Sequence, residues 1–300
     1  MSHAIIIPIY CENRNTINLC NELQNFGAEH IVVVNDGLNP ESEYFNELTS
    51  IGCHLVHLKN NNGKGASLKA GIKYAHDNLY NITGYITCDA DGQHTANDVM
   101  KISRMLDLRN GSLILGKRDY KKSKMPINIR IGNRLSSAYF KVITGKSCKD
   151  TQTGLRGIPA FLYDTVMKTK GSRFDFEMNF LTKCADMRVP FYFVNIIADC
   201  SNCSSNFRLI KDTYLIYRTP LRFATASIGC TIIDLVLFTI FAYILPSHMF
   251  FNIMLATLMA RVVSGGINFL INRKVIFGNT DNGTKQALRF FILFFCIMCA

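Results

Sequence analysis

The sequence predicts an α/β fold, a mainly parallel sheet with helices on both faces, followed by a transmembrane α-helical domain. Three observations lead to this prediction. Short apolar runs alternate with amphipathic patterns up to about residue 120, polar residues follow these runs, and long apolar runs lie near the C-terminal end. Alternating strands and helices are typical of parallel sheets whose two faces are covered by helices.

Five short apolar runs are the expected strands, because each is too short to form an independent helix. They are Ala4–Ile9, Ile31–Asn35, His54–Leu58, Tyr85–Cys88 and Leu113–Leu115. Between them, apolar residues recur at the spacing of an amphipathic helix. These residues are Ile17, Cys20, Leu23 and Phe26 in one expected helix and Leu68, Ile72 and Ala75 in another.

The C-terminal region is apolar on all sides of its expected helices. Phe223–Leu245 and Ile253–Ile271 each reach the length of about 20 residues that a membrane-spanning helix needs. A third run begins at Phe290 shortly before the sequence ends, so we expect a truncated chain. A buried helix of a soluble bundle would keep a polar stripe. The expected domains are residues 1–210, an amphipathic juxtamembrane segment 211–222 and a transmembrane domain 223–300.

Composition limits the partners and the compartment. The net charge of +11 and the pI of about 9.1 suit an anionic membrane, a phosphorylated substrate or nucleic acid. Nucleic acid is disfavoured, because no recognisable module interleaves basic and aromatic residues. The 11 cysteines follow no disulfide pattern, as expected in a reducing compartment. Basic residues beside the apolar runs place the N-terminal domain on the cytosolic face by the positive-inside rule.

The segment Thr87–His94 places two aspartates directly after an expected strand. Asp89 and Asp91 supply carboxylate oxygens, Gln93 an amide oxygen and His94 an imidazole. Because the backbone turns after a strand, these groups can converge on one cation. Oxygen ligands suit Mg²⁺ or Mn²⁺ beside a substrate diphosphate. An Asp-x-Asp pair alone is equally compatible with a solvated loop.

Polar residues also follow the first three expected strands. Tyr10 and Glu12 follow the first, Asp36 the second, and Asn62–Gly65 the third. Ligands of open α/β sheets bind at the carboxyl ends of strands, so we expect these residues at one site. Asp36-Gly37 by itself fits a plain turn. Asn62–Gly65 lacks the spacing of a Walker loop, and its Lys64 is expected near phosphate.

Taken together, these motifs resemble those of glycosyltransferase family 2, whose catalytic domain has the GT-A fold, a Rossmann-like arrangement. The chain resembles the dolichyl- and polyprenyl-phosphate sugar transferases of that family in Asp150–Arg156, Arg173–Glu177 and Ser204–Arg208. Residues Ala260–Phe277 are similar to the GtrA-like membrane domain often fused to such enzymes. Asn35 departs from the family, which commonly has the first aspartate of a pair there.

The resemblance implies metal-dependent, inverting transfer of a hexose from a nucleotide-diphosphate sugar, of the GDP-mannose or UDP-glucose type. The implied acceptor is a polyprenyl or dolichyl phosphate at the cytosolic membrane face. Metal binding is implied for Asp89, Asp91 and Gln93. The residues implied to bind the nucleotide are Pro8, Tyr10, Glu12, Asp36, Lys64, Asp89, Ala90 and Asp91.

The acceptor side calls for arginines, because donor diphosphate and acceptor phosphate are both anions and a guanidinium matches phosphate geometry. The family places its phosphate-binding arginines at Arg118 and Arg130, with Arg134 as a third. An anionic acceptor attacks without a strong general base. We therefore expect Asp150, the family's candidate base, to orient groups or act electrostatically. The basic segment Lys117–Lys124 is equally compatible with a solvated loop or one on anionic lipid headgroups.

Two other functions stay open at this point. One is transfer to a polysaccharide or another non-lipid acceptor. The other is translocation of a lipid-linked sugar with an inactive catalytic head, against which the intact Asp89, Asp91 and Gln93 set argues. The membrane domain is also a candidate surface for homo-oligomers. Within it, Asp234 and Arg261 fall at similar depths of antiparallel runs, so we expect these two charges to pair.

Overall fold

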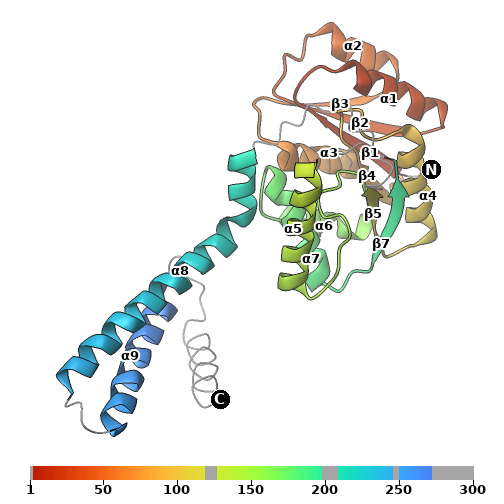
Figure 1. The fold of residues 1–300 in the computed structure, drawn as a ribbon. Helices are drawn as coiled ribbons and strands as arrows, with labels where there is room; N and C mark the ends of the chain where they lie inside the picture. The colour runs from red at the N-terminus through yellow and green to blue at the C-terminus, as the bar shows by residue number, and fades with distance from the viewer. Residues whose placement is uncertain (1–2, 119–126, 198–208, 246–249, 272–300) are drawn as a thin grey trace. The chain divides into compact units, whose positions relative to one another are not determined.

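The structure is a computed structural model that describes residues 3–118, 127–197, 209–245 and 250–271. It divides into two compact units, Met1–Asp212 and Thr213–Ala300 (Figure 1). The first unit contains β1 (His3–Ile9), α1 (Arg14–Asn25), β2 (His30–Asp36), α2 (Glu43–Ser50), β3 (His54–Leu58), α3 (Lys64–Asn78), β4 (Gly84–Thr87), α4 (Ala96–Leu108), β5 (Leu113–Arg118), α5 (Ile127–Thr144), β6 (Arg156–Pro159), α6 (Tyr163–Lys168), α7 (Phe174–Asp186) and β7 (Phe191–Ile196).

Among the described residues, the seven strands form one sheet in the order β3-β2-β1-β4-β6-β5-β7. All neighbouring pairs are parallel except those of β6, which runs antiparallel to both β4 and β5. The five expected strands are confirmed as β1 to β5. The strands β6 and β7 were not predicted. The four-residue sequence of β6, Arg-Gly-Ile-Pro, carries no alternating pattern, and only its neighbours on both sides make it a strand.

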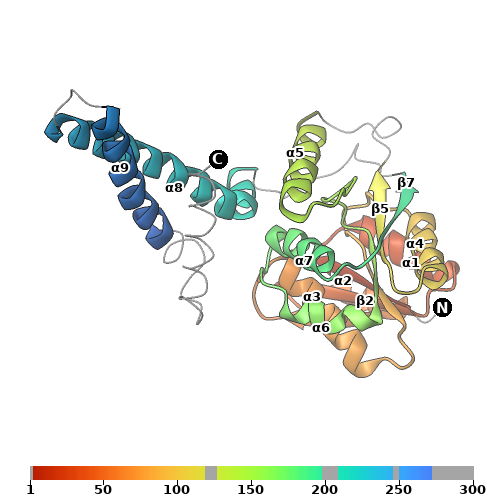
Figure 2. The ribbon, with the colours of Figure 1, turned by 90° about the horizontal axis from the view of Figure 1, so that it is seen from below.

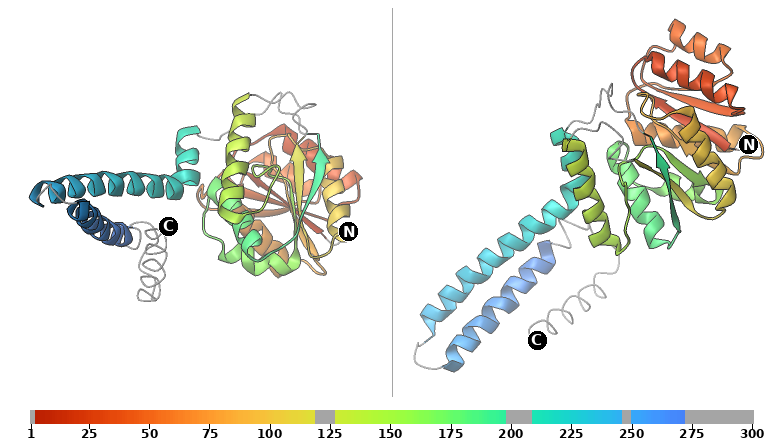
Figure 3. Two further views of the ribbon diagram at one scale, coloured as in Figure 1. Left: turned by 60° about the horizontal axis from the view of Figure 1, so that its bottom comes forward. Right: turned by 45° about the vertical axis from the view of Figure 1, so that its right-hand side comes forward.

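Helices cover both faces of the sheet, as predicted (Figure 2, Figure 3). Helices α1, α2 and α4 pack in one layer, and α3, α5, α6 and α7 in the other. Strand β1 contributes side chains to both cores. Ile5 and Ile7 point to the first layer, whereas Ala4 and Ile6 point to the second. One detail of the prediction is wrong: Phe26 lies beyond the end of α1 and is 51% exposed.

The second unit contains most of α8 (Leu209–Ile244) and all of α9 (Phe250–Ile271), two long antiparallel helices that lie side by side (Figure 3). Their apolar windows, Thr225–Ile244 and Asn252–Ile271, have mean hydropathies of 2.0 and 1.6 and are long enough to cross a membrane. The segment 211–222 forms an early part of α8. Its side chains, and the third run that begins at Phe290, lie outside the described residues.

The expected ion pair between Asp234 and Arg261 does not form. Instead, Ser264 Oγ donates a hydrogen bond of 2.7 Å to Asp234 Oδ1. Ser264 lies one helical turn after Arg261, so Asp234 does face this part of α9, but at a different residue. Arg261 itself is exposed. Burying a neutral hydroxyl between helices costs less free energy than burying a charged guanidinium. This difference favours Ser264 as the partner of Asp234.

Candidate active site

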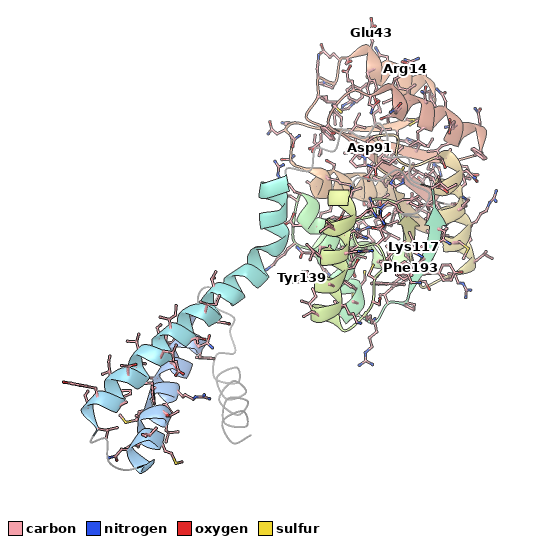
Figure 4. The ribbon with its side chains drawn as sticks, in the orientation of Figure 1. Arg14, Glu43, Asp91, Lys117, Tyr139 and Phe193 are labelled. Atoms are coloured by element: carbon pink, nitrogen blue, oxygen red, sulfur yellow. The ribbon has the colours of Figure 1, made fainter. Side chains whose placement is uncertain are left out.

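Two aspartates follow the end of β4, where the carboxyl ends of the parallel strands meet. Asp89 and Asp91 lie in this loop, with Asp91 labelled in Figure 4. The last residue of β4, Thr87, donates from Oγ1 to the main-chain oxygen of Gly154 (2.7 Å). A side chain at Gly154 would collide with the Asp89 carboxylate. Close packing of the backbone before β6 therefore fixes where Asp89 can lie.

Lys64 is the main cationic partner of Asp89. Its Nζ lies 2.6 Å from Asp89 Oδ1 and 3.2 Å from Glu177 Oε1. Burial by itself opposes both charges, but the two carboxylates outweigh it and raise the pKa of Lys64. Burial likewise would raise the pKa of Asp89, yet Lys64 and then His94 hold that pKa well below its usual range. Both groups are therefore charged at neutral pH.

Within the described ranges, no cationic side chain forms an ion pair with Asp91. Its Oδ1 accepts a hydrogen bond of 3.1 Å from the Gln93 backbone, and its Oδ2 accepts another from the Gln93 side-chain amide. Burial, and next the charge of Asp89, raise the pKa of Asp91. The two carboxylates thus repel each other electrostatically. Gln93 orients Asp91 by donating a hydrogen bond from its side-chain amide. The sequence predicts Gln93 as a metal ligand and does not predict this contact.

His94 is buried beside the two aspartates. Its side chain is 1% exposed, and its Nε2 lies 3.6 Å from Asp89 Oδ2. Apart from this longer contact to Asp89, neither ring nitrogen has a hydrogen-bond partner among the described residues. Buried polar atoms are normally satisfied, so an unpartnered imidazole beside a carboxylate pair points to a bound group.

The donor set fits a hard divalent cation. Asp89 and Asp91 offer carboxylate oxygens, which suit Mg²⁺ or Mn²⁺. His94 adds a ring nitrogen near Asp89. Within the ranges that the structure describes, no three His, Cys, Asp or Glu side chains gather as a complete ligand cluster. These side chains alone would fill only part of a coordination shell, which is usual where Mg²⁺ is also bound by a substrate phosphate.

Asp36 has a structural task that the sequence reading missed. It is 4% exposed, and its two carboxylate oxygens accept hydrogen bonds from the backbone of Asn62 (2.7 Å) and Gly63 (2.9 Å). Gly63 has a φ of +94° and lies against Arg173 and Ser172 with no room for a side chain. Asp36 thereby holds the loop that delivers Lys64 at the start of α3.

Asn35, the residue that departs from the family pattern, also has local partners. Its side chain accepts from the Leu38 backbone (2.7 Å) and donates to the Leu38 carbonyl (2.9 Å), and it contacts His57. It closes the turn after β2.

The residues expected near the nucleotide base lie at the same edge of the sheet. Pro8 is half-buried near the end of β1, while Tyr10 and Glu12 are exposed beyond it. Ala90 is held from the side of α1, because Thr16 Oγ1 donates to its carbonyl (3.0 Å). These positions leave the Tyr10 ring and the Glu12 carboxylate accessible to a ligand.

Arg118 and Asp150 form a buried ion pair. Nε and Nη2 of Arg118 donate to Oδ2 (2.7 Å) and Oδ1 (2.8 Å) of Asp150, a two-pronged contact. Asp150 is fully buried and Arg118 is 6% exposed. The carboxylate also accepts from the backbone of Arg118 and Gln152. This pairing anchors Asp150 and directs two of the Arg118 donors away from solvent. The orienting role expected for Asp150 stays a prediction.

The two remaining candidates for the acceptor phosphate lie on α5. Arg130 and Arg134 are both exposed and one turn apart, so both guanidinium groups can reach one anion. Lys117, labelled on β5 in Figure 4, precedes the buried Arg118. Residues 119–126, which include most of the predicted basic loop, lie outside the described residues, as does Ser204–Arg208.

Comparison with known proteins agrees with this geometry. Residues 4–164 match the model of glycosyl transferase family 2, and residues 222–300 match the GtrA/DPMS transmembrane domain. An uncharacterized protein of Methanocaldococcus jannaschii is 32% identical over 188 residues, covering 59% of this chain and 73% of the relative. The UDP-N-acetylglucosamine–dolichyl-phosphate N-acetylglucosaminyltransferase of Methanococcus voltae is 30% identical over 172 residues, covering 51% and 67%.

Solved structures support the fold. Glucosyl-3-phosphoglycerate synthase from Mycobacterium tuberculosis, crystallised with Mn²⁺ and UDP-glucose, has a TM-score of 0.54 at 12% identity over 74% of this chain and 78% of that one. At this identity the likeness shows a shared GT-A-like fold alone. The matched catalytic model covers more than half of the chain, and the two apolar helices lie in the matched membrane domain. The chain therefore belongs to glycosyl transferase family 2, and is a membrane-bound glycosyltransferase with a GtrA/DPMS transmembrane domain.

Proposed function

We propose that the protein transfers a sugar from a nucleotide-diphosphate sugar to a polyprenyl or dolichyl phosphate, with inversion at the anomeric carbon. The observation that carries the proposal is the cluster of Asp89, Asp91 and Lys64 at the carboxyl edge of the sheet, in a chain with a GtrA/DPMS membrane domain. The relative from Methanococcus voltae is named for a dolichyl-phosphate acceptor. This supports the lipid acceptor over a polysaccharide.

On the donor side, Asp89, Asp91 and His94 would hold Mg²⁺ or Mn²⁺. The cation, when bound, neutralises charge on the leaving diphosphate. Tyr10, Glu12 and Pro8 contact the base and ribose in this proposal, and Lys64 approaches the diphosphate. Asp36 keeps the Lys64 loop in place, which is a supporting role in addition to the nucleotide contact that the family resemblance implies.

On the acceptor side, an oxygen of the lipid phosphate attacks the anomeric carbon. The bond between that carbon and the donor diphosphate breaks, and the nucleoside diphosphate leaves. The acceptor is already anionic, so no proton has to be removed. The protein's task is to hold two anions together, which Arg130 and Arg134 do through charge-assisted hydrogen bonds. Arg118 and Asp150 fix the base of this region.

In this proposal, transfer takes place on the cytosolic face. Basic residues flank the apolar helices, and the positive-inside rule therefore places the N-terminal unit in the cytosol. Protease should digest the first unit, Met1–Asp212, called the catalytic unit below, in sealed vesicles of cytosol-out orientation. Protection of that unit would reverse the orientation.

The central experiment offers membranes containing the full chain labelled UDP-glucose, UDP-N-acetylglucosamine and GDP-mannose in separate reactions with polyprenyl phosphate. We expect one donor to give a labelled lipid whose formation stops with EDTA and resumes with Mg²⁺ or Mn²⁺. A labelled product in the polysaccharide fraction, with none in the lipid fraction, would overturn the acceptor.

A further inference from the structure

Glu177 is a buried carboxylate to which none of the roles above has been given. It lies in the first turn of α7 and is 7% exposed. Its Oε1 accepts no hydrogen bond within the part of the chain that the structure describes, although Lys64 Nζ is 3.2 Å away. A buried carboxylate that is incompletely satisfied is costly, so its retention beside a cation calls for a reason.

Arg156 fixes the position of Glu177. Its Nη1 donates to the Glu177 main-chain oxygen (3.0 Å), and its Nη2 lies 3.8 Å from Oε1. The same guanidinium donates to the carbonyls of Thr153 and Thr151. Arg156 is thus held at several points and is 2% exposed. Arg156 therefore fixes the backbone of Glu177 and lies near its carboxylate. Lys64, in contrast, carries its ammonium on a flexible four-carbon stem.

Lys64 contacts the carboxylates of both Asp89 and Glu177. In the proposed function a divalent cation also binds Asp89. An ammonium 2.6 Å from Asp89 Oδ1 occupies one of the two oxygens that Asp89 could offer to a divalent cation. Like charges at such distances repel strongly in a buried site. Lys64 cannot leave for an apolar interior unless another anion receives it. Glu177 is that anion, and it already lies within reach.

We propose that Glu177 is a positioning residue, a second carboxylate that receives Lys64 when a divalent cation and the donor diphosphate bind at Asp89. The inference rests on the proposed function, since it needs a metal-bound donor. Lys64 and the cation then compete for Asp89, and Glu177 weakens the hold of Lys64 on that oxygen.

The test measures Mn²⁺ binding to the full-length protein in nanodiscs, without nucleotide, from the electron paramagnetic resonance signal of free Mn²⁺. Lys64→Met removes the competitor and should tighten binding by about tenfold, the effect of one charge-assisted contact. Glu177→Gln confines Lys64 to Asp89 and should weaken binding several-fold. Lys73→Met, an exposed lysine on the same helix, and Asp186→Asn, exposed at the end of α7, are the matched controls and should leave it unchanged.

The double variant Lys64→Met with Glu177→Gln separates positioning from plain attraction between charges. If Glu177 acts through Lys64, its substitution has no effect once Lys64 is gone, and the double variant binds Mn²⁺ like Lys64→Met. Additive effects would overturn the inference. Glu177→Asp, which keeps the charge but withdraws the carboxylate, should weaken binding like Glu177→Gln and guards against misfolding of one variant. Wild-type protein that binds no Mn²⁺, with or without UDP or GDP, would instead remove the metal from the proposed function.

Discussion

The catalytic unit (Met1–Asp212) and the membrane unit (Thr213–Ala300) place the same apolar residue types in opposite environments. In the first, Ile, Val and Leu side chains fill two cores between sheet and helices. In the second, Ile228, Leu235 and Val262 are each more than half exposed on α8 and α9. A helix that turns such residues outward is stable only where its surroundings are hydrocarbon. Exposed apolar side chains would destabilise the first unit in water, whereas the second unit needs them to contact the membrane.

The two units also differ in which partners their buried and half-buried carboxylates have. The catalytic unit matches charge with charge, as in Arg118 with Asp150 and Lys64 with Asp89. In the membrane unit the carboxylate of Asp234 is matched by the hydroxyl of Ser264, and the nearby Arg261 is exposed. Buried ion pairs therefore occur at the candidate active site, whereas Asp234 in the membrane unit is matched by a neutral group. Four substitutions test this contrast.

The largest effect is expected from the buried ion pair. Arg118→Met leaves the Asp150 carboxylate fully buried without its guanidinium, which costs about 3–5 kcal/mol. At about 2–4 °C per kcal/mol, the melting temperature of the catalytic unit should fall by roughly 10 °C. Arg14→Met is the matched control, because its pair with Glu47 is largely exposed and is worth at most about 1 kcal/mol. Equal shifts for both variants would contradict the importance of burial.

Asp91→Ala should abolish metal-dependent transfer without unfolding the protein. It removes a carboxylate from the cation site, and we expect at least about a hundredfold lower turnover. Turnover is measured with the donor identified above, and circular dichroism checks the fold. Near-normal turnover with Mg²⁺ or Mn²⁺ in the variant would place the cation elsewhere.

Arg130→Ala should impair use of the lipid acceptor by about tenfold, the value of a charge-assisted hydrogen bond to phosphate. Donor binding, titrated without acceptor, should change much less. Arg104→Ala, an exposed arginine on α4, serves as the control for general charge. A similar loss of donor and acceptor binding would move Arg130 to the donor side.

The smallest effect is expected in the membrane unit. Ser264→Ala removes the partner of Asp234, and hydrogen bonds between membrane helices average about 0.6 kcal/mol. Thermal unfolding in lipid nanodiscs should detect this against Thr257→Ala, whose hydroxyl bonds only within its own helix. If Arg261→Ala destabilised the helices more than Ser264→Ala, the charge pair predicted from sequence would regain support.

Local patterns in the sequence were sufficient for much of this molecule. The strands β1 to β5 follow from short apolar runs, and the two apolar windows of α8 and α9 from their length and composition, because periodicity and hydropathy act over neighbouring residues. The gathering of polar residues at one edge followed from a general rule of parallel sheets. These features need no knowledge of which distant residues meet.

Contacts between distant segments were decided only by the tertiary structure. The antiparallel β6 brings Gly154 against Asp89 and Arg156 beside Glu177, which places Lys64 between two carboxylates. Asp36 as the holder of the 62–63 loop, and Arg118 as the partner of Asp150, arise in the same way. A residue's type and its neighbours in sequence predict which chemistry it offers. Which partner satisfies it depends on the packing of elements far apart in the chain, because only burial makes one partner much more favourable than the others.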